Sequence, residues 1–216
     1  MGFRIWREAE PLDLKNTRFR AQTLGRTLGG STPETIYISF SAEIIPHTTE
    51  ALIALISQQV NIGVKNVHLL MSTPGGSVMN GMNLYNFLRA LPLELTTHNI
   101  GNVDSIGNAV FLAGAKRYAC ANSTFMFHGV GIDLNGPLRL DEKLLEEKLD
   151  AVLADQKRIG AVLAERTRIE KHAIADLFRE AKTKDAAFAA RYGIIDEIRD
   201  VTIPAGGPIH SLVFQR

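Results

Sequence analysis

Cysteine is almost absent from this chain. Among 216 residues Cys120 is the only one, so an intrachain disulfide is excluded and a zinc cluster of thiolates cannot form. The six histidines show no His-Glu-x-x-His spacing or similar ligand pattern, which leaves metal catalysis without support. We therefore expect no metal and no cofactor.

An excess of charge of either sign is also missing, as is any long apolar run. The chain has 24 basic and 23 acidic residues, a balance that argues against nucleic acid as a partner. No stretch approaches the roughly 20 apolar residues needed to cross a bilayer. Residues 1–20 are charged throughout and lack the apolar core of a signal peptide. These features predict a cytoplasmic protein that does not bind membranes.

Segments with the composition of strands alternate with segments of helical periodicity along the first part of the chain. The patterns predict strands over 35–40, 66–72, 93–100 and 123–130, and helices over 48–60, 78–91 and 109–115. Because strands that alternate with helices pair in parallel through right-handed crossovers, we expect an α/β fold.

A longer helix is predicted over 139–167, where apolar residues recur at steps of three, four and seven. At 1.5 Å per residue it would be about 40 Å long, more than a domain of this size needs on its surface. We expect it to project and pack on another subunit; the alternative is a helix folded back along its own domain. Another helix is expected to start in 170–182, and the segment 185–198 is expected to end a helix at Gly193 before a short strand. The predicted organisation is an N-terminal arm (1–34), a main domain (35–200) and a C-terminal tail (201–216).

The segment "NVDSIGNAV" (102–110) places Ser105 between a predicted strand and a helix. A side chain there lies at the carboxyl edge of a parallel sheet, where α/β proteins bind ligands. The first amides of the helix are unpaired and can stabilise an oxyanion. Ser105 is therefore a candidate nucleophile, although a helix cap is the ordinary use of such a serine.

Two further segments carry residues suited to the same chemistry. In "STPGGSV" (72–78), Gly75 and Gly76 permit a tight turn with open amides, and no lysine follows them as in a phosphate loop. His128 ends the apolar strand "TFMFH" (124–128) and is followed by a glycine. Taken alone, the glycine pair is an ordinary strand-to-helix turn and the histidine is structural or solvated.

The order of these features resembles the proteolytic subunit of the Clp protease, a family of serine peptidases with a crotonase-like fold. The resemblance covers about residues 36–200 and is carried by "STPGGSVMNGMNLYNFL", "IGNVDSIGNAVFLAGAKRYACANSTFMFH" and "YGIIDEI". It implies a ClpP-like head domain with Ser105 as nucleophile and His128 as general base. The resemblance also implies an oxyanion hole from the amides of Gly76 and Ile106. The long helix resembles the family's handle, through which two rings of subunits stack.

Three positions depart from the family pattern. The triad aspartate of the family falls on Leu177, with Asp176 one position away; Glu180 and Asp185 are the next acids. We take Asp176 as the candidate third member, with another carboxylate or a serine–histidine dyad as alternatives.

An acid also precedes the nucleophile, where the family has a small residue. Asp104 could crowd Ser105 or help to define a substrate pocket. Residues 1–34 do not resemble the family's axial loops, which leaves the AAA+ unfoldase partner in doubt.

The resulting expectation is a serine endopeptidase that hydrolyses peptides or unfolded proteins inside a homo-oligomeric chamber of stacked rings. One alternative is a crotonase-type enzyme that uses the same amides to stabilise the enolate of an acyl-CoA thioester. Another is a catalytically impaired ring subunit that acts as a scaffold. A serine–lysine dyad with Lys116 or Lys65 is a lesser variant, which no spacing supports.

Overall fold

A single mixed sheet forms the centre of the molecule. The computed structural model describes residues 20–24, 32–132, 139 and 141–214. The main path of the sheet runs in the order β1-β9-β2-β3-β4-β5-β8, and β6 pairs with β4 and β7. The strands are β1 (Arg20–Leu24), β2 (Thr35–Ser41), β3 (Asn66–Thr73), β4 (Glu94–Asp104), β5 (Lys116–Ala119), β6 (Thr124–Met126), β7 (Thr183–Asp185), β8 (Glu197–Ile198) and β9 (Ile209–Val213).

Pairing within this sheet is mostly parallel. The pairs β2–β3, β3–β4, β4–β5 and β4–β6 are all parallel, whereas β1–β9 and β6–β7 are antiparallel. The carboxyl ends of β3, β4 and β6 therefore meet at one edge, with Thr73 opposite Val103 and Asp104 opposite Met126. This α/β arrangement confirms the predicted fold class.

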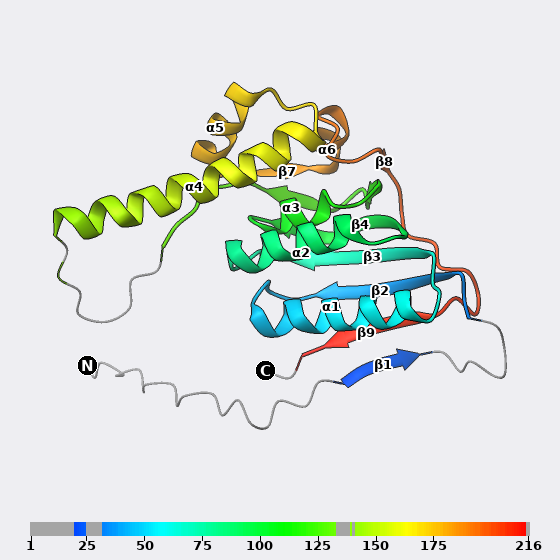
Figure 1. Cartoon of the computed structure of the whole chain (residues 1–216). Coiled ribbons are helices and arrows are strands. Elements are labelled where there is room, and N and C mark those ends of the chain that lie inside the picture. Colours follow the sequence, from blue (N-terminus) through cyan, green and yellow to red (C-terminus); the bar gives the residue numbers. More distant parts are fainter. Residues whose placement is uncertain (1–19, 25–31, 133–138, 140, 215–216) are drawn as a thin grey trace, which may run out of the picture.

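Helices connect the central strands and cover one face of the sheet (Figure 1). They are α1 (Pro46–Asn61), α2 (Val78–Ala90) and the short α3 (Gly107–Phe111). Apolar side chains from both layers fill the core, and Phe40, Phe111 and Phe125 are fully buried. Each such phenylalanine contributes about 2 to 3 kcal/mol relative to an exposed position, so the core holds the strand ends in place.

The long helix α4 (Glu142–Arg166) is 25 residues in length, or about 38 Å. Its first turn is capped by the Asp141 carboxylate, which accepts a hydrogen bond from the Leu144 amide. Ile159 and Leu163 in the second half are buried, and Figure 1 shows the first half extending beyond the sheet. After it come α5 (Lys171–Glu180) and α6 (Ala186–Arg191), which complete the fold.

Several elements differ from the sequence predictions. The strand predicted over 123–130 is only β6, and β5, β7 and β9 were not expected. These strands are three to five residues long, too short for a clear period of two. The strands β1 and β9 lie in the predicted arm and tail, and they pair with each other at the edge of the sheet. Chain ends that join a sheet in this way carry no local signal of the pairing.

Candidate active site

Ser105 follows the last residue of β4 and stands just before α3. Its φ is +55°, a left-handed conformation that is uncommon for a residue with a side chain. The N-cap of α3 is Ile106, and the helix has no side-chain cap. The interpretation of Ser105 as a helix cap is therefore wrong. A residue held in this conformation at a sheet edge points to function, since surrounding contacts must maintain it.

The glycine turn after β3 lies directly against this serine. Gly75 and Gly76 have φ values of +91° and +142°, which side chains rarely permit. A Cβ on Gly75 would stand 2.6 Å from the Ser105 Cβ, and one on Gly76 would collide with the Ile44 carbonyl oxygen. Both glycines are thus required by the backbone path and by the close approach of the turn to Ser105.

Two amides near Ser105 are left without acceptors. The residues on both sides of Gly76 bond to Ile44: the Ile44 amide donates to the Gly75 carbonyl at 2.7 Å, and the Ser77 amide donates to the Ile44 carbonyl at 2.8 Å. The Gly76 N–H itself donates to no described residue. The Ile106 N–H at the start of α3 likewise has no acceptor within the described ranges. Open amides of this kind are the donors from which an oxyanion hole is built.

His128 lies two residues beyond β6, which pairs with the end of β4. Its Nδ1 is 2.6 Å from the carbonyl oxygen of Gly129. A carbonyl oxygen only accepts hydrogen bonds, so the hydrogen must be on Nδ1 in the neutral ring. The Nε2 atom then carries the lone pair. This is the tautomer that a general base requires.

Ser105, His128 and Gly76 line one cavity of about 240 Å³. The other lining residues are Val78, Phe127, Gly129, Val130, Gly131, Ile159 and Phe178. The Ser105 Oγ makes no hydrogen bond to His128 within the described structure. Catalytic hydrogen bonds are often long in free enzymes and shorten when substrate binds, so this arrangement is compatible with a serine–histidine pair.

The acids considered from the sequence do not line this cavity. The Asp176 carboxylate is on an exposed part of α5 and accepts a hydrogen bond of 2.8 Å from Arg179. Leu177, the position of the family aspartate in the sequence comparison, is buried in the core. Glu180 pairs with Lys184 at 2.8 Å, and Asp185 caps α6 through the Phe188 amide. Asp176 as third member of a triad stays a prediction.

Asp104 has a different environment from the other acids. Its Oδ2 accepts a hydrogen bond of 2.6 Å from Asn102. The Asn102 side chain is held in turn by the Thr73 carbonyl and the Ser72 hydroxyl. This polar chain fixes the carboxylate beside the turn that carries the two glycines.

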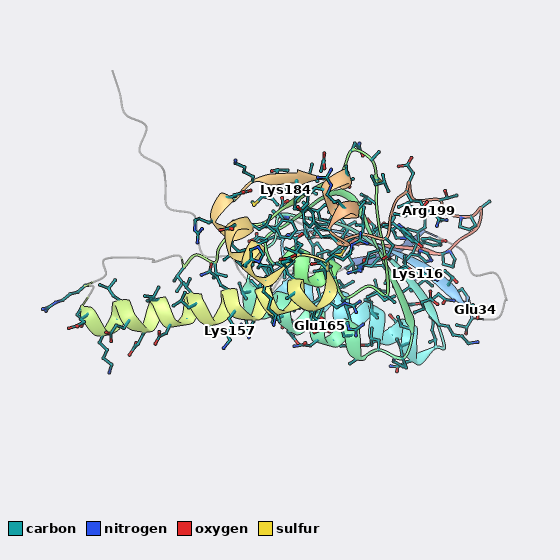
Figure 2. The ribbon with its side chains drawn as sticks, turned by 90° about the horizontal axis from the view of Figure 1, so that it is seen from above. Glu34, Lys116, Lys157, Glu165, Lys184 and Arg199 are labelled. Carbon is teal, nitrogen blue, oxygen red and sulfur yellow. The ribbon has the colours of Figure 1, made fainter. Side chains whose placement is uncertain are left out.

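A groove of about 610 Å³ between α4 and α5 adjoins the cavity. Gly129 and Phe178 line both spaces. Gly160, Ile174 and Lys157 also line the groove, and Figure 2 labels Lys157 on α4.

A second group of histidines lies at the opposite edge of the sheet. His68 Nδ1 and His98 Nε2 are 2.9 Å apart, and the rings are stacked. Burial lowers the pKa of His98 to about 4, and the neighbouring charges of His68 and Arg199 add to this effect. Burial also lowers the pKa of His68, although the Glu94 carboxylate opposes the change. The sequence alone does not predict this pair, because only the register of β3 and β4 brings the two residues together.

The lysines considered for a dyad lie at this second edge and not near Ser105. Lys116 at the start of β5 pairs with Glu94 at 2.5 Å, and Lys65 pairs with Glu34 at 3.5 Å. Figure 2 shows Lys116 and Glu34 at the end of the molecule away from Lys157. Neither lysine lines the cavity that contains Ser105, so the structure does not bring either of them together with this serine.

Comparison with known families adds to this geometry. The family model described as Clp protease matches residues 32–202. The chain belongs to the Clp protease family. Membership confirms the predicted ClpP and crotonase-like fold and indicates a peptidase. Proteins of this family generally form oligomeric rings and act on peptides.

Two features are absent from the described part of the Clp-like chain. None of its described helices is long and apolar enough to cross a membrane. Nor do its described histidine, cysteine, aspartate and glutamate side chains form a group of three or more suited to a metal ion.

Proposed function

We propose that this chain is a serine endopeptidase in which Ser105 is the nucleophile and His128 the general base. One observation carries the proposal: a strained serine shares a small cavity with a histidine and with an open glycine amide. Strain at this residue is maintained by the fold, and a left-handed nucleophile directs its Oγ away from its own helix. Membership of the Clp protease family supports the same assignment.

In the proposed mechanism His128 Nε2 accepts the hydroxyl proton while Ser105 Oγ attacks the carbonyl carbon of a peptide bond. The amides of Gly76 and Ile106 donate hydrogen bonds to the tetrahedral oxyanion. Losing one such donor costs about 3 kcal/mol of transition-state stabilisation. The imidazolium then protonates the leaving amine, and water releases the acyl group with His128 again acting as base.

The Gly129 carbonyl takes the position that a carboxylate occupies in a triad. It accepts a hydrogen bond from Nδ1–H, with 2.6 Å between Nδ1 and the oxygen, and so fixes both the tautomer and the ring orientation. A carbonyl carries no net charge, and it stabilises the imidazolium less than a carboxylate would. We therefore infer a serine–histidine dyad. Asp176 is the candidate acid for the alternative, a complete triad.

The long helix is the proposed contact between subunits. Leu145, Leu149 and Leu153 are each more than half exposed and recur every four residues, so they share one face of α4. An apolar stripe of this kind is buried in an assembly. We infer a homo-oligomer of stacked rings whose chamber encloses the sites and admits peptides or unfolded chains. Cytoplasmic location and an AAA+ unfoldase partner stay predictions.

The test is reaction with a fluorophosphonate probe followed by mass spectrometry of the labelled peptide. Wild-type protein is expected to carry one phosphonyl group on Ser105 and to hydrolyse a fluorogenic peptide. Ser105→Ala is expected to lose both reactions. A well-folded, assembled wild-type protein that neither labels nor hydrolyses would contradict the peptidase and favour the scaffold. Turnover of an acyl-CoA thioester without phosphonylation would favour the crotonase-type alternative.

A further inference from the structure

The strained backbone of Ser105 is held by a small set of hydrogen bonds around Asn108. The Ser105 amide donates to the carbonyl of Met126 at 2.9 Å. The Asn108 side-chain Nδ2 donates to the Ser105 carbonyl at 3.0 Å and to the Met126 carbonyl at 2.8 Å. Asn108 thus ties together the nucleophile and β6, the strand that leads to His128.

Both hydrogens of the Asn108 amide are used in these two bonds, and the residue is almost completely buried, at 1% exposure. The orientation of the amide is fixed by its partners, because an inverted amide would place Oδ1 against two carbonyl oxygens. The Asn108 side chain therefore adds a second link between Ser105 and the end of β6, beside the direct bond from the Ser105 amide to the Met126 carbonyl.

The other end of the same amide has no partner. Asn108 Oδ1 is buried and accepts no hydrogen bond in the described structure. A buried acceptor without a donor destabilises a fold, and most buried polar atoms are paired. A small apolar residue would avoid this cost at a position that is otherwise enclosed by the core. The two donated bonds are the feature that an apolar residue could not supply.

We propose that Asn108 is a positioning residue of the peptidase site, acting through Ser105. This inference rests on the proposed function, since its effect on rate is exerted on the attacking hydroxyl. Without the two side-chain bonds, only the Ser105 amide bond to Met126 and the bond from the Asn108 backbone amide at 3.1 Å hold this turn. We expect these two to be insufficient, so that Ser105 relaxes from its left-handed conformation and its Oγ moves relative to His128. Asn108 does not line the cavity or the groove, so binding of the peptide is preserved while attack is slowed.

The test compares Asn108→Asp and Asn108→Ala with the matched variant Asn99→Ala. Asn99 is also fully buried, and its Nδ2 donates to the carbonyl of Thr124 on the same strand at 2.7 Å. Its side chain makes no hydrogen bond to Ser105 in the described structure, and Asn99→Ala therefore reports general loosening of β6. Rates are normalised to the folded fraction measured by near-ultraviolet circular dichroism.

The Asn108 variants are expected to reduce kcat and the phosphonylation rate by about 10- to 100-fold, the size of effect caused by a misplacement of about 1 Å. KM is expected to change by less than about twofold, since the contacts that bind the substrate are unchanged. Crystal structures are expected to show Ser105 at negative φ in Asn108→Ala and at its original φ in Asn99→Ala. This structural readout does not depend on activity.

Three results would overturn the inference: an unchanged kcat in both Asn108 variants, an equal loss in Asn99→Ala, or a retained left-handed Ser105 in Asn108→Ala. In the first case, an inactive Ser105→Ala variant would show that the proposed peptidase function still holds. If wild-type protein itself neither labels nor hydrolyses, the proposed function fails, and the φ of Ser105 alone decides whether Asn108 holds it. Should the aspartate variant not fold, the alanine variant gives the same comparison.

Discussion

Two edges of one sheet carry histidines in this molecule, and their surroundings differ. At the carboxyl edge His128 meets a cavity, a strained serine and open amides. At the amino edge His68 and His98 stack on each other between Tyr37 and Tyr118. The rings at this edge continue to Arg199, whose guanidinium lies 5.1 Å from the Tyr118 ring centroid.

The difference shows what makes a histidine available for catalysis. His128 has one nitrogen fixed by a carbonyl and the other free for proton transfer. In the amino-edge pair, His98 Nε2 is bonded to His68 and its Nδ1 is buried without a partner. A ring used for packing has lost the access that proton transfer needs. The following predictions test this contrast, beginning with the largest effect.

Replacement of one histidine at each edge is expected to give the largest difference in kcat. His128→Ala deletes the general base, and kcat for a fluorogenic peptide should fall by about 10⁴-fold or more. His98→Phe preserves the stack and should leave kcat within about twofold. Equal losses in the two variants would show that the edges do not have separate roles.

Gly76→Ala tests the oxyanion amide at the carboxyl edge. The new Cβ would collide with the Ile44 carbonyl oxygen, and alanine is strained at a φ of +142°. The turn must move, and the amide moves with it. We expect kcat to fall by about 10²- to 10³-fold, as for loss of one oxyanion donor. Gly63→Ala is the control, because Gly63 is also at positive φ but lies away from the cavity. A Gly76→Ala enzyme with normal kcat would exclude this amide from the oxyanion hole.

The buried pair at the amino edge should make stability depend on pH. The pKa of His98 is about 4 in the folded chain against an ordinary 6.5, so the unfolded chain binds its proton first. The contribution of neutral His98 to the free energy of unfolding is complete above about pH 6.5 and is lost as pH falls through 4. The shift corresponds to about 3 kcal/mol, which solvent screening of this incompletely buried group reduces to about 1 to 2 kcal/mol.

Urea unfolding at pH 7.5 and at pH 4.5 measures this loss. Wild-type protein should lose more free energy of unfolding between the two pH values than His98→Gln, which cannot titrate. A difference in the opposite sense, or parallel curves for the two proteins, would contradict the assignment of a depressed pKa.

The smallest expected effect is that of Asp176→Asn. Its carboxylate binds Arg179 on the exposed side of α5, whereas the Gly129 carbonyl holds His128. We expect kcat to change by less than about threefold across the pH range. A loss near 10⁴-fold, as expected of a triad aspartate, would establish Asp176 as the third member and exclude the dyad.

Much of the carboxyl edge could be predicted from the sequence, because its signals are local. The glycine pair after β3 and the serine before α3 each mark the end of a parallel strand. The positive φ of Ser105 and the carbonyl partner of His128 could not be predicted, since neither residue type nor spacing encodes them. Asn108 also gave no signal, because its role depends on the backbone of β6, which is distant in sequence.

The amino edge shows more clearly what cannot be predicted from the sequence. His68 and His98 are separated by 30 residues and meet only through the parallel register of β3 and β4. Local periodicity places each on its own strand but gives no pairing between strands. Likewise, the family pattern predicts a carboxylate as the partner of His128, whereas the atom beside Nδ1 belongs to the backbone.

The most direct measurement is a crystal structure of the protein after reaction with a small fluorophosphonate. The account predicts phosphorus bonded to Ser105 Oγ, with its phosphoryl oxygen about 2.7 to 3.1 Å from the amide nitrogens of Gly76 and Ile106. His128 Nε2 should lie within hydrogen-bond distance of the Ser105 oxygen. Phosphorus on another residue, or a phosphoryl oxygen directed away from both amides, would contradict the proposed site.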